Sequence, residues 1–475
     1  MGNGLEDRLQ VKVRPWAVVI PDSGTWQAFD CDPDAMPAWT EDGAVREHGL
    51  ILREKLESHP AVASALQKVL SIDFSSRHPI YFQIQGGEAE RFRWEALWDN
   101  DKEFLALDAR WPIARMVEPP ESAPKQKHLF TPPLRVMALM SALGRPAKPQ
   151  WKELYAAVEK TREQGLDVEL SVFFGEEDLL AAVRKDIEQG TVTGVRAGAI
   201  DNPAGIEAAI DDFKPHILHF FCHGSASVGR PQLELAKITD HDLGKSSVIL
   251  GIKQLAGFQA LSHVWLVTLN CCEGGKSVAD LHSMAHQLVV NVVPAAIGML
   301  EPIDAGDAHR FCGAFYAAVF RMVRQFVEDS PPEETEIEWA ETLHSSRTLL
   351  SQSDPGPVSR VEWTLPVLYV RRDRFEVTLK APPSPEVQQS LKLQAEEQQA
   401  MKLRAESIAT VLRGLAPDTP AELRDEILAT LNDLPLALRP DRHGNFQEAS
   451  DKIEELVIEM PQMSSDSAGS FSGAS

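Results

Sequence analysis

The sequence predicts an α/β protein whose mostly parallel sheet is covered by helices on both faces. From Leu134 onward, short apolar runs alternate with helix-length amphipathic segments. The runs carry few polar residues, as expected of parallel strands that are buried on both faces. The predicted strands are 134–139, 167–174, 216–221, 264–269, 292–299 and 365–371. The predicted helices between them are 151–164, 206–213, 276–289, 305–325 and 337–351.

The length of 475 residues predicts two or three domains. Residues 1–130 are predicted as an N-terminal α+β region, with strand-like runs at 11–21 and 79–85 and helical spacing over 47–70. The α/β core is predicted over 131–380. A polar, Gln- and Glu-rich helical extension is expected over 381–462, and a disordered Ser/Gly-rich tail over 463–475.

Composition excludes several classes of function. Lys and Arg number 47 against 70 Asp and Glu, so the net charge is −23, which argues against direct binding of nucleic acid. Five Cys residues are odd in number and sparse, which indicates free thiols in a reducing compartment such as the cytoplasm. The N-terminus has no apolar signal core, and the apolar runs are too short to span a bilayer. No membrane association is therefore expected.

Two motifs follow neighbouring apolar runs and could carry chemistry. His223-Gly224 follows the run 216–221, and Cys271-Cys272-Glu273-Gly274-Gly275 follows the run 264–269. Ligands of open parallel sheets bind at the carboxyl ends of the strands, where these residues would meet if the two strands are neighbours. A thiol needs a nearby base to become a thiolate, and histidine supplies one near neutral pH. Backbone N–H groups of Gly224 and Cys272 could hold an oxyanion.

Other interpretations of these residues stay open. A buried Cys or His at a strand end is commonly part of the core. Metal binding by Cys222-His223 and Cys271-Cys272 is disfavoured, because adjacent ligands do not match the spacing of structural zinc sites. Neither a P-loop nor a GxGxxG motif fits the chain, so no metal and no cofactor are expected.

The motifs resemble those of the CHAT domain, the caspase-like branch of the caspase/separase cysteine peptidases. The strand ending in His223-Gly224 and the strand ending in Asn270-Cys271-Cys272-Glu273-Gly274 are similar to the two family motifs. The stretches 93–98, 104–107, 113–115, 295–299 and 363–369 are similar to flanking family motifs, and the resemblance covers roughly 75–375. Arg93 and Gly274 depart from the usual family residues.

The resemblance implies a caspase-like fold and a cysteine endopeptidase. His223 would be the general base and then the acid, and Cys272 the nucleophile that forms a thioester acyl-enzyme. The family further implies a protein substrate, a regulatory protein partner and a role in bacterial antiviral defence or cell death. The alternatives are a protein-binding scaffold on the same fold with an unused dyad, and another hydrolase or acyltransferase using the dyad.

Candidates for the substrate pocket lie beside the dyad. Asn270 precedes the nucleophile by two residues, and the loop after 295–299 carries Glu301, Asp304 and Asp307. An acidic lining would favour Arg or Lys before the cleaved bond. In a chain with 70 acidic residues, the simpler explanation of these three carboxylates is that they are solvated loop residues.

Overall fold

The computed structural model describes residues 9–14, 17–19, 27–29, 31–71, 77–84, 87–120, 128–227, 230–271, 281–329 and 334–380. The chain divides into two units, residues 1–380 and 381–475, and every described residue belongs to the first. The extension predicted over 381–462 and the tail predicted over 463–475 lie outside the described residues.

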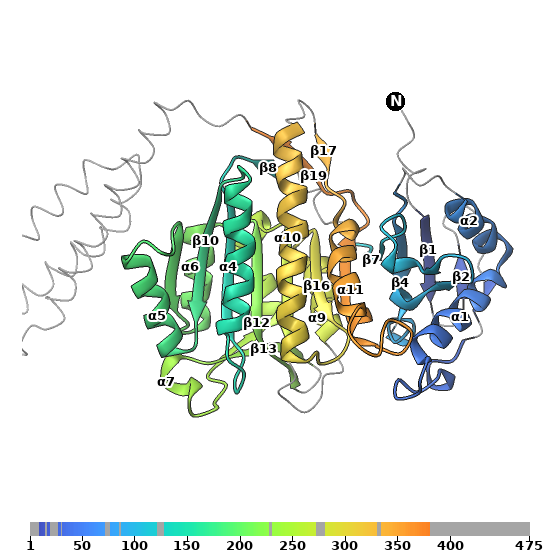
Figure 1. The fold of residues 1–475 in the computed structure, drawn as a ribbon, viewed down its shortest axis with the longest axis horizontal. Helices are drawn as coiled ribbons and strands as arrows, with labels where there is room; N and C mark the ends of the chain where they lie inside the picture. The colour runs from blue at the N-terminus through green and yellow to red at the C-terminus, as the bar shows by residue number, and fades with distance from the viewer. Residues whose placement is uncertain are drawn as a thin grey trace, which may run out of the picture. The chain divides into compact units, whose positions relative to one another are not determined.

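One sheet of fourteen strands runs through the described part of the chain (Figure 1). Its main path has the order β11 (Val195–Ala199), β10 (Val168–Phe174), β9 (Leu134–Ser141), β12 (Ile217–Ser227), β15 (Leu266–Cys271), β16 (Ala295–Met299), β18 (Pro366–Arg371), β7 (Ile113–Val117), β4 (Ile80–Ile84), β1 (Leu9–Arg14), β2 (Ala17–Val19) and β3 (Gln27–Ala28). The strands from β11 to β16 are parallel to one another. The strands β18, β7, β4 and β1 are also parallel to one another, but β18 is antiparallel to β16. The predicted mostly parallel α/β sheet is confirmed, with a reversal of direction between β16 and β18 and further antiparallel pairing at β2, β3, β13 and β14.

Strand β12 changes partners along its length. Its first six residues pair with β9 on one side and β15 on the other, both in parallel. Residues 223–227 then pair antiparallel with β13 (Arg230–Leu235), which pairs with β14 (Val248–Gly251). Two small sheets stand apart: β17 (Thr335–Glu336) with β19 (Glu376–Leu379) and β8 (His128–Phe130), and β5 (Trp98–Asp99) with β6 (Glu103–Phe104).

Helices cover both faces of the sheet (Figure 1). One face carries α4 (Lys148–Glu163), α5 (Glu177–Glu188), α10 (Ala305–Asp329) and α11 (Leu343–Ser351), together with α1 (Ala44–Glu57) and α2 (Pro60–Leu70). The other face carries α6 (Pro203–Phe213), α8 (Ile252–Ala256) and α9 (Leu281–Asn291). Shorter helical turns are α3 (Gly87–Glu90), α7 (Ile238–His241), η2 (Pro33–Ala35), η3 (Trp94–Ala96), η4 (Leu105–Leu107), η5 (Gln259–His263), η6 (Trp339–Thr342) and η7 (Glu362–Thr364).

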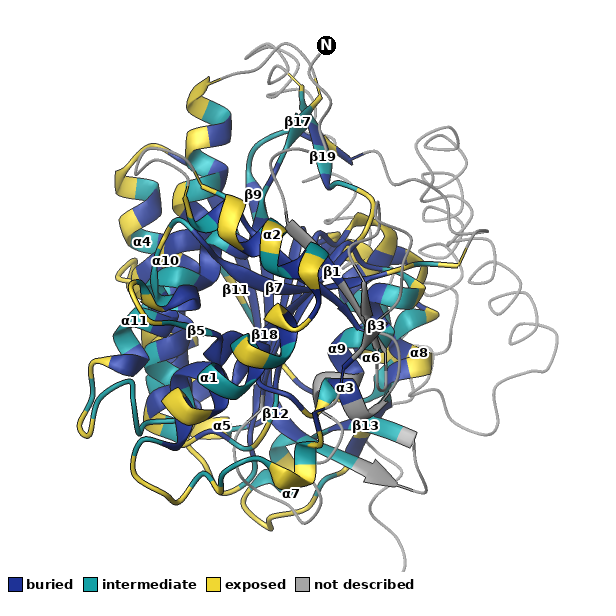
Figure 2. Ribbon diagram, turned by 90° about the vertical axis from the view of Figure 1, so that its right-hand side faces the viewer, coloured by how far each residue is buried: buried dark blue, intermediate teal, exposed yellow. Residues whose placement is uncertain are grey.

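The double cover explains why the strands are apolar throughout. In β12, Ile217 and Phe221 face the α4–α10 side, whereas Leu218 and Cys222 face the α6–α9 side. All four are fully buried, and in Figure 2 the strands lie as a buried layer between helices whose outer surfaces are exposed. No helix among the described residues has the length and apolar character needed to cross a membrane.

Some element boundaries differ from the sequence-based expectation. The helical spacing over 47–70 belongs to two helices, because Pro60 starts α2 and His59 Nδ1 accepts hydrogen bonds from the first free N–H groups. The strand-like run 11–21 contains two antiparallel strands, β1 and β2. Helix α5 and the hairpin β13–β14 were not among the predicted elements. The sheet also crosses the boundary expected at 130/131, since β1, β4 and β7 continue it through β18.

Candidate active site

His223 lies on β12 at the carboxyl edge of the parallel strands. It directly follows Cys222, whose register partners are Ser141 of β9 and Cys271 of β15. The backbone of His223 pairs with Glu234 of β13, and its side chain is only 5% exposed. The imidazole is therefore carried by a continuous strand that is paired on both sides of it.

A backbone carbonyl orients this imidazole. His223 Nε2 lies 2.6 Å from the carbonyl oxygen of Leu143, so Nε2 carries the proton and donates it to that oxygen. Leu143 is in the turn after β9, where Arg145 N donates to Ala142 O over 2.8 Å and Gly144 has a φ of +72°. This combination is that of a type II turn, whose central carbonyl is not used within the turn. Nδ1 is then the nitrogen that can take a proton.

The carboxylate of Glu234 accompanies His223 on the paired strand. Partners in an antiparallel register project to the same side of a sheet. Burial alone would raise the pKa of Glu234, but hydrogen bonds from Ser225, Ser246 and Gln232 and the charge of His223 hold it below its ordinary value. Ser246 Oγ donates to the carboxylate over 2.8 Å. Glu234 is thus an ionised group beside the imidazole, which the sequence motifs did not single out.

The predicted nucleophile, Cys272, lies outside the described residues. It follows Cys271, the last residue of β15, directly in the sequence. The helix expected to begin near residue 276 is described only from Leu281, as α9. Of the two residues predicted to form an oxyanion hole, Gly224 is on β12 and pairs with Leu233, and Cys272 is not described.

The first turn of α10 packs against the residues that precede the dyad. Asn270 Nδ2 donates to the carbonyl oxygen of Ala308 over 2.9 Å. The ring of Phe221 lies 5.4 Å from that of His309. Phe221 stands two residues before His223 on β12, so the two side chains share a side of the sheet. The positive end of the α10 dipole therefore faces the carboxyl edge of β12 and β15.

The predicted pocket residues have other partners among the described residues. Asn270 is fully buried, and its Oδ1 has no hydrogen-bond partner among the described atoms. Asp304 is exposed, and its carboxylate accepts from Gly306 N over 2.7 Å, which caps α10. Asp307 is buried and forms ion pairs with Arg310 and Arg360. The substrate-lining role of these three residues stays a prediction.

A buried hydrogen-bond network lies directly behind the site. His219 and Thr268 are register partners on β12 and β15, four residues before the predicted catalytic pair. Tyr316 of α10 donates to Thr268 Oγ1 over 3.2 Å and lies 3.0 Å from His219 Nδ1. His219 Nε2 lies 3.1 Å from the amide nitrogen of Gln150. These contacts fix a neutral His219 that donates through Nδ1 and accepts at Nε2, and they tie both strands to α4 and α10.

Acid is expected to destabilise the protein through this network. Burial lowers the pKa of His219 to about 3, against an ordinary value of 6.5. The unfolded chain therefore binds the extra proton first, and the free energy of unfolding should fall as the pH drops from 6.5 towards 3. By pH 5 this one group should remove about 2 kcal/mol relative to pH 7. The measurement is urea unfolding at both pH values in the wild type and in His219→Gln.

The matched control for that experiment is Thr268→Val. This variant breaks the same network but removes no titrating group. It should lower stability at both pH values and keep the wild-type dependence on pH, whereas His219→Gln should reduce that dependence by the contribution of this one group. An equal pH dependence in all three proteins would contradict the prediction.

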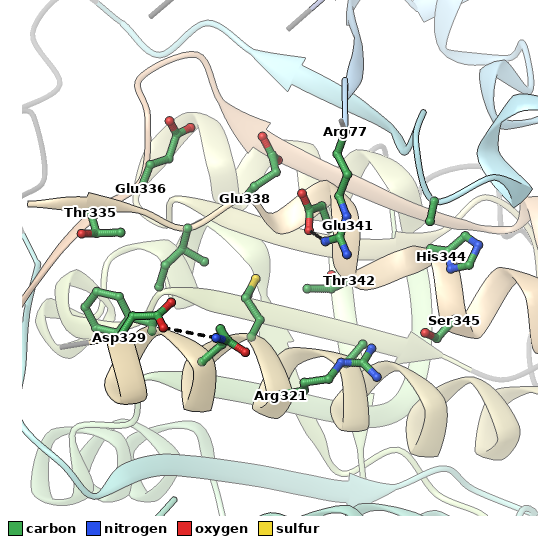
Figure 3. Close-up of a pocket in the computed structure, with 16 residues that line it drawn as sticks. Arg77, Arg321, Asp329, Thr335, Glu336, Glu338, Glu341, Thr342, His344 and Ser345 are labelled. Carbon is green, nitrogen blue, oxygen red and sulfur yellow. Dashed lines mark hydrogen bonds and ion pairs between the residues drawn. The ribbon is translucent and has the colours of Figure 1, made fainter. Parts of the chain in front are cut away.

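A separate cavity of about 740 Å³ lies on the α10–α11 side of the sheet (Figure 3). Figure 3 shows Arg77 directed at Glu341, with Glu336 and Glu338 along one wall. The other wall is the carboxyl half of α10, from Ala318 to Asp329. This wall lies roughly 15–30 Å along the helix from Ala308, so the cavity is distant from the predicted dyad.

Three further cysteine side chains lie in the core of the described residues. Cys31, Cys222 and Cys312 are buried, and burial raises the pKa of Cys312 well above its ordinary value. Among the described residues, no group of three or more His, Cys, Asp or Glu side chains is arranged to hold a metal ion.

The fold and this edge together define the class of the protein. A mostly parallel sheet, helices on both faces and a strand-borne histidine beside a cysteine-bearing strand end are the fold implied for caspase-like cysteine peptidases. A family model described as the CHAT domain matches residues 59–325, more than half of the chain and a range that contains His223 and Cys272. The chain belongs to the CHAT-domain family.

Comparison with individual proteins adds less. No curated protein matches the sequence. Among the solved structures that match is separase, from the separase–securin complex of Saccharomyces cerevisiae. The sequence identity is 10% and the TM-score is 0.30, and the match covers 68% of this chain but 17% of the separase chain.

Proposed function

We propose that this protein is a cysteine endopeptidase that hydrolyses peptide bonds of a protein substrate through His223 and Cys272. The observation that carries the proposal is the register of β12 and β15, which pairs Cys222 with Cys271. The residue that follows Cys222 is His223, and the residue that follows Cys271 is Cys272. Neighbouring strands are about 5 Å apart, so the proposal takes His223 and Cys272 to act on each other across this edge of the sheet.

The hydrogen bonds of the site suit histidine to both proton transfers. With Nε2–H held by the Leu143 carbonyl, Nδ1 accepts the proton of the Cys272 thiol. The thiolate attacks the carbonyl carbon, and the oxyanion is stabilised by the N–H groups of Gly224 and Cys272. The carboxylate of Glu234 favours the imidazolium that forms.

The second half of the reaction restores the site. His223 returns its proton to the departing amine, the C–N bond breaks, and a thioester remains on Cys272. Water, deprotonated by the same Nδ1, hydrolyses the thioester and releases the new carboxylate. The α10 dipole stabilises negative charge at this edge throughout. No metal or cofactor takes part in these steps.

The family resemblance extends the proposal to a biological setting. We place the peptidase in the bacterial cytoplasm, in an antiviral defence or cell-death system, under the control of a protein partner. Residues 1–75 and 381–475 are the parts of the chain that the family motifs leave for such control.

A covalent probe tests the activity directly. A peptide acyloxymethyl ketone should alkylate the nucleophilic sulfur, and peptide mapping by mass spectrometry should find the tag on Cys272. The matched variants are Cys271→Ala, which should still be labelled, and Cys272→Ala, which should not. Labelling that follows Cys271 would overturn the assignment. Absence of labelling and of peptide cleavage in the wild type would favour a scaffold with an unused dyad.

A further inference from the structure

The sheet edge that carries the candidate catalytic residues continues onto β16. β15 pairs in parallel with β16 on the side away from β12. β16 ends at Met299, and Leu300 and Glu301 follow it at this edge. Glu301 therefore lies one strand beyond β15, on the side away from His223.

A cavity of about 510 Å³ opens at this position. Leu300 and Glu301 form one wall, and segments from the N-terminal third of the chain form the rest. Its apolar lining consists of Pro33, Met36, Pro37, Trp39, Phe92 and Leu300. The volume lies within the range of about 300–1,000 Å³ that is typical of ligand pockets.

Each charged residue that lines this cavity forms an ion pair. Arg93 forms an ion pair with Glu301 and is 2% exposed, whereas Glu301 is 51% exposed. Arg93 also donates to Thr364 Oγ1 over 3.2 Å and lies 4.5 Å from the centre of the Trp39 ring. The two other charged lining residues are paired as well, Arg91 with Asp34 and Glu90 with Arg115.

The remaining polar residue of the lining is uncharged at neutral pH. His48 stacks on Trp39 with ring centres 3.6 Å apart and bonds through Nε2 to the carbonyl oxygen of Pro37. Burial lowers the pKa of His48 to about 4. The cavity thus offers apolar walls and no unbalanced charge.

From this we propose that the cavity receives a large uncharged side chain of the substrate, next to the bond that is cleaved. A basic or an acidic side chain would meet the Arg93–Glu301 ion pair, in which each charge already has its partner, so either would lose its hydration without gaining a free counter-ion. A large apolar side chain buries its surface against the Trp39, Phe92 and Leu300 walls. The inference rests on the proposed peptidase function, and it replaces the preference for Arg or Lys that an unpaired acidic lining would give.

A positional peptide library with the wild-type enzyme is the first test. At one position beside the cleaved bond, kcat/KM should be at least about tenfold higher for Phe, Tyr, Trp, Met or Leu than for Lys, Arg, Asp or Glu. A preference for a charged residue at every position of the library would overturn the inference.

Two reciprocal substitutions make the test specific for this cavity. Glu301→Gln leaves the charge of Arg93 without its partner, so the ratio of kcat/KM for Glu peptides to that for Lys peptides should rise about tenfold or more. Arg93→Met leaves the carboxylate of Glu301 and should shift the ratio in the opposite direction. Glu328→Gln removes a carboxylate of similar exposure from the far end of α10 and should leave the ratio unchanged.

The outcomes separate this inference from the function on which it rests. Arg93 is buried, so the stability of Arg93→Met should be checked by thermal melting. Glu301 is half exposed, and the selectivity of Glu301→Gln alone therefore decides whether the cavity is a subsite. Cleavage that depends on Cys272 but keeps its selectivity in Glu301→Gln would show that the cavity is not a subsite. Absence of any Cys272-dependent cleavage would remove the peptidase function and the inference together.

Discussion

Replacement of His223 by alanine should lower kcat/KM for a cleaved peptide by about a thousandfold, the scale expected when a general acid–base residue is removed. The imidazole is held through Nε2 by the Leu143 carbonyl, so Nδ1 is the nitrogen assigned to the proton transfer. The residual rate comes from thiolate that forms without the base. Steady-state kinetics on one peptide substrate gives the measurement.

A double variant distinguishes a catalytic pair from two independent losses. Because both residues act in the same proton transfer, His223→Ala combined with Cys272→Ala should be no less active than Cys272→Ala alone. Circular dichroism should show unchanged secondary structure, since the pairing of β12 with β13 is made by the main chain. A His223→Ala enzyme that keeps more than a tenth of the wild-type rate would exclude His223 as the base.

Replacement of Arg115 by methionine should destabilise the fold by about 3–5 kcal/mol, because it leaves a buried carboxylate without its partner. Arg115 and Glu95 are both fully buried, and the guanidinium donates to the two carboxylate oxygens over 3.2 and 3.1 Å. Arg115 also donates to Glu90 over 2.7 Å and to the carbonyl oxygen of Phe92 over 3.0 Å. Urea unfolding at pH 7 measures the loss.

A surface pair provides the control for this substitution. Arg372 and Glu118 are 2.8 Å apart with side chains 47% and 45% exposed, so Arg372→Met should change stability by less than about 1 kcal/mol. Equal losses in the two variants would contradict a role for burial.

The strands that carry the site could be predicted because burial on both faces leaves a direct mark on the sequence. The run before His223 and the run before Cys271 are apolar at nearly every position, and each ends where a small or polar residue is needed at the sheet edge. Their register, Cys222 opposite Cys271, agrees with the expectation that the two motifs meet at one edge.

Other parts of the site left no such mark. The Leu143 carbonyl is a backbone group 80 residues from His223, so no pattern of side chains in the sequence predicts its hydrogen bond to the imidazole. The pair formed by Arg93 and Glu301 spans 208 residues, and the acidic residues after β16 therefore looked unpaired in the sequence. Strand direction also could not be predicted from the sequence, because β18 is as apolar as its neighbours although it is antiparallel to β16.

The place of β7 beside β18 bears on how the protein can be divided. A fragment cut to begin at residue 131 would retain β18 but lose the strand that pairs with Tyr369, Val370 and Arg371. The backbone N–H and C=O groups of β18 that pair with β7 would then be exposed and could pair with strands of other molecules, which commonly leads to aggregation. The N-terminal third thus shields the interior of the sheet, and a dissection of this chain needs to keep it.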